Sequence, residues 1–229
     1  MGIIISATLI GKEKMKILKP QKIFLEKLIK IENIAEKIKD NENIENILIS
    51  DNLIENFELY NANIEKVVCK NIDILNGKII KNTFTDVVFE KCNFSNTNFE
   101  SCCFIRCEFK ECKLAGCNFA ETRLYNVTLI NTNASYINFS LASMENVLFQ
   151  ETLLRSSYFQ ENMLKNVYFE KADLMQAQFA KTSLKDVDLS TSIITGIAIS
   201  IEDIKGAIIE EYQASELLYL LGIKIKNNY

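Results

Sequence analysis

One apolar residue recurs at every fifth position through most of the chain. In its most regular part the repeat gives Phe84, Phe89 and Phe94. Followed outward in the same phase, the register begins at Ile44 and ends at Ile199, which makes thirty-two consecutive sites without a slip. Internal repetition on this scale is the first feature that a fold prediction has to satisfy.

A period of five fits neither a helix nor a flat strand. A five-residue step along an α-helix rotates the apolar position by about 140°, which spreads it around the helix surface. Along a flat strand, an odd step places successive apolar side chains on opposite faces. The chain must therefore turn a corner within every five residues. Such a chain winds into a coil whose turns stack through parallel backbone hydrogen bonds.

A second periodic position lies two residues before each bulky one and is usually small or branched, as at Val87, Cys92 and Thr97. One large and one small inward residue in each unit would fill a narrow lumen. The other three residues are mostly Asn, Glu, Lys, Ser and Gln, so we expect them to face solvent. Ala134 is small for a central site and Ile137 is large for a secondary one, which predicts a local repacking or a slight bend.

Segments such as 171–175 (KADLM) and 116–120 (GCNFA) resemble the pentapeptide-repeat proteins, whose consensus is A(D/N)LXX. The resemblance covers residues 44–199. It implies an all-β solenoid, a right-handed quadrilateral β-helix with four pentapeptides in each coil and about eight coils in all. We expect an N-terminal extension and cap over 1–43, the β-helix over 44–199, and a C-terminal helical cap and dimerisation segment over 200–229.

The N-terminal end of the coil needs a cover, because a bare first coil exposes unpaired backbone groups and an apolar lumen. Between residues 16 and 40, apolar residues at helical spacing predict a helix that supplies this cover: Phe24, Leu28, Ile31, Ala35 and Ile38. The first fourteen residues are predicted to be dispensable for folding.

Beyond Ile199 the period stops, and the sequence predicts an α-helix from Glu210 to Leu221 that ends at Gly222. Its apolar stripe consists of Ala214, Leu217, Leu218 and Leu221. The tail resembles the C-terminal cap of the quinolone-resistance branch of the family, where that cap makes an end-to-end homodimer. Tyr212 and Tyr219 lie nearly opposite the apolar stripe, so we expect them, together with Leu220, at the dimer interface.

Composition agrees with a single rod. Among 229 residues there are one Pro and seven Gly, so no Pro- or Gly-rich linker divides the array. The longest apolar run is far shorter than the ~20 residues that cross a membrane, and no secretory signal is recognisable. Seven cysteines without an export signal predict a reducing, cytoplasmic location.

No enzyme constellation is visible, and we predict a non-enzymatic protein without cofactor or metal. The chain has no His, and its few Gly form no phosphate-binding loop. Four inward cysteines fall within one coil and present two alternatives: Cys102, Cys107, Cys112 and Cys117. They could bind zinc, or they could simply pack as compact buried side chains, which we favour. Cys103 is expected to be an incidental surface thiol.

The outer surface is where we expect function. Counting faces from the Ile44 column, the second face consists of residues 47–51 and the segments at successive steps of twenty up to 187–191. It has the largest acidic excess, −3, and an outward apolar column. Its predicted partner-binding residues are Leu48, Asp51, Val68, Val88, Glu90, Glu108, Glu111, Leu148, Glu151, Tyr168, Glu170 and Asp188. The alternative is that stacked side chains there only stabilise the ladder.

The resemblance to the quinolone-resistance branch implies a rod that imitates B-form DNA in shape and charge, and that occupies the DNA-binding saddle of DNA gyrase or topoisomerase IV. This chain departs from that branch because no loop interrupts residues 44–199. Its coil region has nineteen acids and fourteen bases, a net charge of −5. Eight coils would span about 38 Å, over which duplex DNA carries about 22 charges.

The competing hypothesis is a rigid cytoplasmic scaffold that binds an unrelated protein. Direct nucleic-acid binding is not predicted, because a net acidic chain without a basic stripe offers no contact for phosphates. No membrane contact is predicted either.

Overall fold

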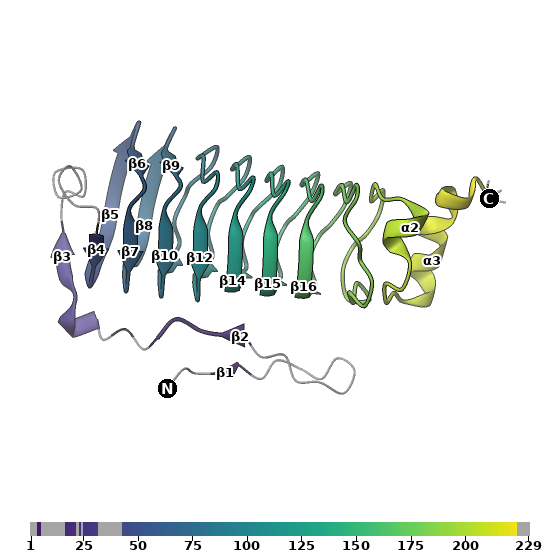
Figure 1. Ribbon diagram of the computed structural model, residues 1–229, viewed down its shortest axis with the longest axis horizontal. Helices are drawn as coiled ribbons and strands as arrows, with labels where there is room; N and C mark the ends of the chain where they lie inside the picture. Colours follow the sequence, from purple (N-terminus) through teal and green to yellow (C-terminus); the bar gives the residue numbers. More distant parts are fainter. Residues whose placement is uncertain (1–3, 6–16, 22, 24, 32–42, 224–229) are drawn as a thin grey trace.

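The computed structural model describes residues 4–5, 17–21, 23, 25–31 and 43–223. From residue 43 onward the chain winds into flat coils that stack along one axis, with a helical cap at the C-terminal end (Figure 1). The strands are β1 (Ile4–Ile5), β2 (Ile17–Leu18), β3 (Ile29–Ile31), β4 (Asn43–Glu45), β5 (Ile47–Glu55), β6 (Glu58–Tyr60), β7 (Asn63–Glu65), β8 (Val68–Leu75), β9 (Lys78–Ile80), β10 (Thr83–Thr85), β11 (Val88–Glu90), β12 (Cys103–Ile105), β13 (Glu108–Lys110), β14 (Arg123–Ile130), β15 (Ser143–Gln150) and β16 (Met163–Glu170). The helical segments are η1 (Leu25–Lys27), α2 (Ile201–Ile204), η2 (Glu211–Gln213), α3 (Ala214–Leu217) and η3 (Leu218–Leu221).

Strand pairing is parallel and repeats every twenty residues, as four units of five require. On the first face, β4, β7, β10, β12, β14, β15 and β16 pair in this order from Asn43 to Met163. Regular pairing therefore spans about six turns rather than the eight predicted. The count is lower because the last coils are joined by isolated bridges, such as Gln178 to Ala198 and Asp188 to Ile208.

Each coil turns its corners through residues in the left-handed region. Every fifth residue from Asn46 to Asp186 has a positive φ, between 50° and 62° for all except Gly116. Many of their backbone N–H groups donate to the carbonyl nineteen residues further on, as Lys66 does to Thr85 at 3.0 Å. At Gly116 a Cβ would lie 2.3 Å from Oδ1 of Asn96, so the Asn96 side chain would have to move to admit a larger residue.

The predicted inward positions are confirmed. All central sites from Phe84 to Leu189 are buried except Leu164, which is partly buried. Most rings twenty residues apart stack, as Phe84 and Phe104 do at 4.8 Å, whereas rings five residues apart meet edge to face. Such aromatic pairs contribute about 0.5–1.5 kcal/mol beyond their buried area. Ala134 is fully buried, and its N–H donates to Leu153 at 2.8 Å, so the ladder continues through this site.

The small inward position is a hydrogen-bond donor site as well as a packing site. The thiols of Cys102, Cys107, Cys112 and Cys117 each donate to a different carbonyl twenty-three residues earlier, with the bonds of Cys102 and Cys117 the shortest at 2.9 and 2.8 Å. The hydroxyl groups of Thr97, Thr132 and Thr152 make the same bond. The position therefore favours compact side chains that can donate, which the periodicity alone did not reveal.

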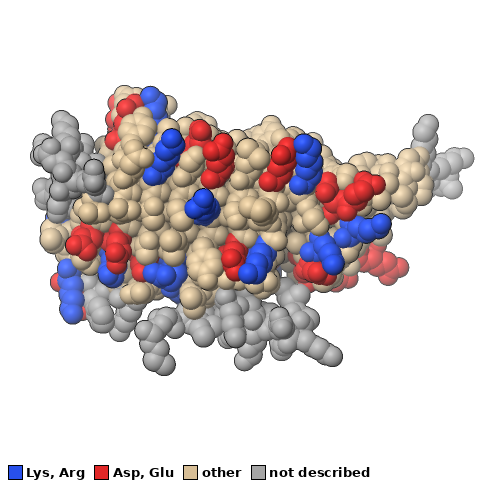
Figure 2. Space-filling model, viewed as in Figure 1, with Lys and Arg blue, Asp and Glu red and all other residues tan. Residues whose placement is uncertain are grey.

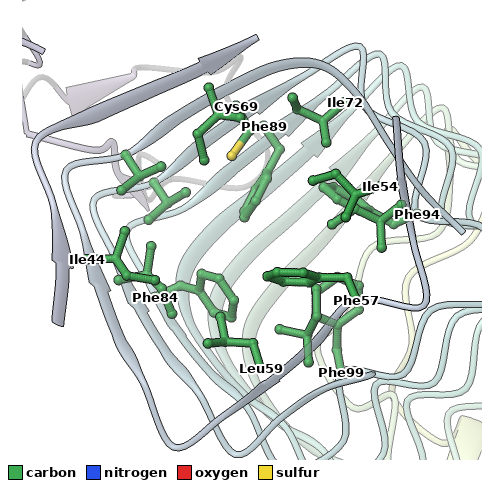
Figure 3. Close-up of a pocket in the computed structure, with 16 residues that line it drawn as sticks. Ile44, Ile54, Phe57, Leu59, Cys69, Ile72, Phe84, Phe89, Phe94 and Phe99 are labelled. Carbon is green, nitrogen blue, oxygen red and sulfur yellow. The ribbon is translucent and has the colours of Figure 1, made fainter. Parts of the chain in front are cut away.

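The lumen is less tightly filled at its N-terminal end. There the central sites carry Ile, Leu and Cys69 instead of Phe, and an apolar cavity of about 60 Å³ remains (Figure 3). Figure 3 shows Ile44, Phe57 and Leu59 pointing into this space from different sides of the coil.

The cover at this end differs from the prediction. Within 25–31, η1 and β3 replace the predicted helix, and β3 pairs in parallel with β5. A strand can satisfy the open backbone groups of β5, which a helix cannot. Ala35 and Ile38 lie outside the described residues, as do nearly all of the first fourteen; of those fourteen, only Ile4 and Ile5 are placed, in β1, which pairs with β2.

The C-terminal cap is helical from Glu211 to Leu221, as η2, α3 and η3 in succession, and Gly222 ends it at φ 69°. The predicted stripe is wrong in part: Leu217 and Leu220 pack on the core, while Leu221 is 62% exposed. The reason is that a 3₁₀ turn has three residues rather than 3.6, which shifts the inward side. No helix in the described part of the chain has the length and apolarity needed to cross a bilayer.

The buried thiols predict how stability depends on pH. Burial raises the pKa of Cys102, Cys107 and Cys117 to about 12. A thiol in the unfolded chain ionises near pH 8.5. The contribution of each buried thiol to the free energy of unfolding is therefore fully present below that pH, and it is lost as the pH rises toward 12. Between pH 8.5 and 12, each thiol makes the free energy of unfolding decrease more steeply with pH, by up to about 1.4 kcal/mol per pH unit.

The check is denaturant unfolding of the wild type and of the triple variant C102T/C107T/C117T between pH 7 and 11. Threonine keeps the donor that this position uses but does not titrate in this range. We expect the stability of the variant to fall less steeply above pH 9. Parallel curves for the two proteins would contradict the proposed role of burial.

Candidate functional site

A short N-terminal segment runs along the second face. We call residues 17–21 and 23 the strap. Figure 1 shows β2 lying beside the stacked coils, running along their axis rather than across it. Ile17 is only 1% exposed and packs against Leu148 and Tyr168. The strap then passes successively earlier coils, where Ile23 and Val68 line the same groove.

Two corner side chains hold the backbone of the strap. The N–H of Leu18 donates to Oδ1 of Asn126 at 3.1 Å, and the N–H of Gln21 donates to Oδ1 of Asp86 at 2.9 Å. Asn126 and Asp86 occupy equivalent corners two coils apart, a distance of about 9.6 Å. Three residues of extended chain cover about 10 Å. The corner ladder therefore matches the spacing of amide groups in an extended strand.

The Asp86 carboxylate beneath the strap is compensated within the coil. It is 1% exposed and accepts two bonds of 2.7 Å from Nε and an Nη atom of Arg106. This hydrogen bonding raises the pKa of Arg106 above its usual value. A second contact to the strap is the ion pair between Lys19 and Glu108, at 3.9 Å. The strap thus approaches a face with acidic side chains at two successive coils.

The contact between the strap and the coils leaves two buried polar atoms without partners and part of a groove unfilled. Among the described residues, Nδ2 of Asn126 and Oγ1 of Thr128 are buried without a hydrogen-bond partner. A groove of about 290 Å³ also remains, lined by Pro20, Ile23, Val68 and Val88 among others. The strap therefore fits closely at Ile17 and loosely nearer the N-terminal end of the coil.

The apolar column predicted on the second face is not uniformly exposed. Val68 and Leu148 are buried, and the prediction that they are open is wrong. Leu48, Val88 and Tyr168 are partly buried. The physical reason is the strap. Leu153, at the equivalent outward position on the next face, is 40% exposed, whereas Leu148 beneath Ile17 is 2% exposed.

Four of the seven predicted acidic residues have basic partners. Lys70 lies 2.9 Å from Glu90 and lowers its pKa, and Lys171 lies 3.2 Å from Glu151. Glu111 pairs with Lys91 at 3.8 Å, and Glu108 with Lys19. Figure 2 shows the same mixing on the side it displays, where acidic and basic side chains lie next to one another.

The other three predicted acids make neutral hydrogen bonds. Asp51 accepts a bond from Asn71, and Oδ1 of Asp188 accepts one from the N–H of Ser190. Glu170 accepts a bond from Gln150, while burial raises the pKa of Glu170. The structure therefore brings the predicted residues to one face, where four of the seven acids are paired with lysines and an acidic excess remains.

The residues expected at a dimer interface lie on the C-terminal cap in different settings. Tyr212 is 68% exposed, and Tyr219 is exposed while its hydroxyl donates to the carbonyl of Ile197. Leu220 is partly buried against the core of the coil. Of the three, the two tyrosines are therefore available at the surface.

Sequence reasoning did not identify the strap or its receptors. The strap is too short to show a period, and its partners are 65 and 108 residues away in the chain. One signal was available: outward apolar residues gather on the second face, as expected for a surface that is covered.

A matched pair of truncations tests the burial beneath the strap. We expect Leu148→Ala to lower the free energy of unfolding by about 2 kcal/mol, because it removes a buried side chain. Leu153→Ala changes the same residue type on an open face and should cost less than about 0.5 kcal/mol. Urea denaturation measures both. Equal losses in the two variants would contradict the packing of Ile17 on Leu148.

Comparison with known proteins adds a family to this geometry. The model of the Pentapeptide repeat region matches residues 82–157 and 102–179. No curated protein sequence matches the chain.

Among solved structures, a trypsin-treated form of QnrB1, a plasmid-mediated fluoroquinolone resistance protein, has 19% identity and a TM-score of 0.49, covering 86% of this chain and 96% of that one. Full-length QnrB1 has 16% identity and a TM-score of 0.36, covering 77% and 100%. HetL, a pentapeptide repeat protein involved in heterocyst differentiation regulation from the cyanobacterium Nostoc, has 13% identity and a TM-score of 0.35, covering 77% and 93%.

All of these identities are low, so the assignment depends on the repeat and on the family model. The five-residue period continues on both sides of the matched region, and pairing at steps of twenty residues continues with it. The chain therefore contains a pentapeptide repeat region, and its five-residue period extends beyond the residues that the family model matches.

Proposed function

We propose that the chain is a non-enzymatic rod that acts by binding another protein along its outside, and that this partner is a type II topoisomerase. The observation that carries the proposal is the filled interior. Large and small inward sites together occupy the lumen through the regular coils, so only the outward columns are left to contact other molecules. The second face differs most from a solvated surface, since its outward residues combine acids with apolar side chains.

The choice of topoisomerase comes from the resemblance of the repeats and the C-terminal tail to the quinolone-resistance branch. A straight rod with a net acidic coil region is compatible with a saddle that accepts duplex DNA. The ion pairs on the second face favour recognition by shape over imitation of DNA charge. A carboxylate beside a lysine contributes little negative electrostatic potential away from the protein surface.

In this proposal the partner meets the protein in the cytoplasm. Two copies join end to end through Tyr212 and Tyr219, which lengthens the rod.

The alternative is a rigid scaffold for an unrelated cytoplasmic protein. The pairing of Glu90 and Glu151 with lysines favours it, because a protein partner does not require a continuous negative surface. The two functions differ in whether purified DNA gyrase responds to the protein.

A supercoiling assay with DNA gyrase, with and without a fluoroquinolone, tests the proposal. We expect the wild-type chain to inhibit gyrase or to protect it from the drug at micromolar concentration. The double variant E111K/E151K reverses two exposed corner acids of the second face, and we expect it to weaken the effect by about tenfold, equivalent to 1.4 kcal/mol.

The control variant is E121K/E161K, which changes exposed acids at the same corner position on another side of the rod. We expect it to act like the wild type. If the wild-type protein neither inhibits nor protects, the topoisomerase proposal is wrong. If both variants lose the effect equally, the second face is not the contact.

A further inference from the structure

We propose that the strip of the second face beneath the strap is a docking channel for an extended segment of a partner protein. The segment carries a branched apolar residue followed two positions later by a basic residue. In the free protein the strap occupies this channel.

The first argument is the apolar anchor site. Ile17 is 1% exposed, and its side chain packs against Leu148 and Tyr168. Without the strap, Leu148 would have the same open setting as Leu153. An outward column that contains an apolar pocket of this kind is suited to one branched side chain of an incoming segment.

The second argument is recognition of the backbone. Asn126 and Asp86 accept bonds from main-chain N–H groups three residues apart, and their spacing is set by two steps of the coil. Main-chain bonds of this kind recognise an extended conformation whatever its sequence. Glu108, with a side chain 16% exposed, adds a preference for a basic residue, as its ion pair with Lys19 shows.

The third argument is that the strap is an imperfect occupant. Oγ1 of Thr128 and Nδ2 of Asn126 are buried without partners, and a buried unsatisfied polar group costs about 1–3 kcal/mol. Near Val68 and Val88 a groove of about 290 Å³ remains beside the strap. A partner segment with a hydrogen-bond acceptor near Thr128 and larger side chains over this groove would fit better. The strap can therefore be displaced.

This inference deepens the proposed function, because it says how the second face receives its partner, and it depends on that function only for the identity of the partner. Binding in the channel can be measured without a topoisomerase. The two proposals can therefore fail separately.

The test uses the full-length chain and a fluorescent peptide of residues 15–23, MKILKPQKI, followed by anisotropy. In the wild type the tethered strap competes at a local concentration in the millimolar range. The substitution Ile17→Asp in the chain places a charge against Leu148 and releases the strap. We expect the labelled peptide to bind this variant at least tenfold more tightly than it binds the wild type.

Two controls make the result specific. The peptide with Ile17→Asp should lose binding, since its anchor is gone. In the Ile17→Asp chain, Leu148→Glu should abolish peptide binding, whereas the matched change Leu153→Glu on the open face should leave it intact. Thermal melts and amide hydrogen exchange of β14 and β15 confirm that each variant remains folded. Local exchange should increase over residues 17–21 alone in the Ile17→Asp chain.

Several outcomes would overturn the proposal. These are equal affinity of the peptide for the wild type and the Ile17→Asp chain, no binding at millimolar peptide, or equal loss with Leu148→Glu and Leu153→Glu. Peptide binding without any response of gyrase would support the channel and contradict the topoisomerase proposal. A gyrase response without peptide binding would do the reverse.

Discussion

The left-handed corner at every fifth residue is the constraint on which the rest of the structure depends. A non-glycine residue in this region costs of order 1 kcal/mol or more, and twenty-eight of the residues that the structure describes adopt it. The cost is offset at each corner by a hydrogen bond to the next coil and by the apolar side chains that the corner turns inward. If the corners were extended, alternate phenylalanines would face water and the ladder would have no register. The same corners align side chains such as Asp86 and Asn126 in columns, and these columns hold the strap.

Much of the fold was predictable because its information is local. The period placed Phe84 and its successors inside, and it required a bend in each unit. It did not say which residue bends, although Asn is frequent at the corners and tolerates the left-handed region, as at Asn56 and Asn71. The ends were harder to predict. Ile31 has helical spacing with Leu28 and Ala35, but it lies in β3, which pairs with the open edge of β5. In the cap, the tight 3₁₀ turns decide that Leu220 rather than Leu221 packs inward.

The candidate site was predictable to the extent that it belongs to the period. The sequence assigned Leu148 and Glu108 to one face, and the structure places them there. It could not show that Leu148 is covered, because the covering residue is more than a hundred positions away and belongs to no repeat. Nor could it show that Glu90 and Glu151 face lysines twenty residues away until the coil length was known. The sequence predicted an exposed apolar column for a partner protein, whereas the structure buries Val68 and Leu148. In the free protein, its occupant is a segment of the same chain.

The strap also changes how far one coil can influence another. In a solenoid, each coil touches only the coils before and after it, so stability is a sum of nearest-neighbour terms and the ends can fray independently. The strap contacts Leu148 in one coil and Glu108 in another, and it lines a groove with Val68 of an earlier coil. It therefore links coils that are not neighbours in the stack. Local unfolding of a coil in the middle of the stack then disturbs the strap, which also contacts coils further away. A short tether thereby turns part of a one-dimensional array into a single cooperative unit, and a ligand that removes the tether would return these coils to local melting.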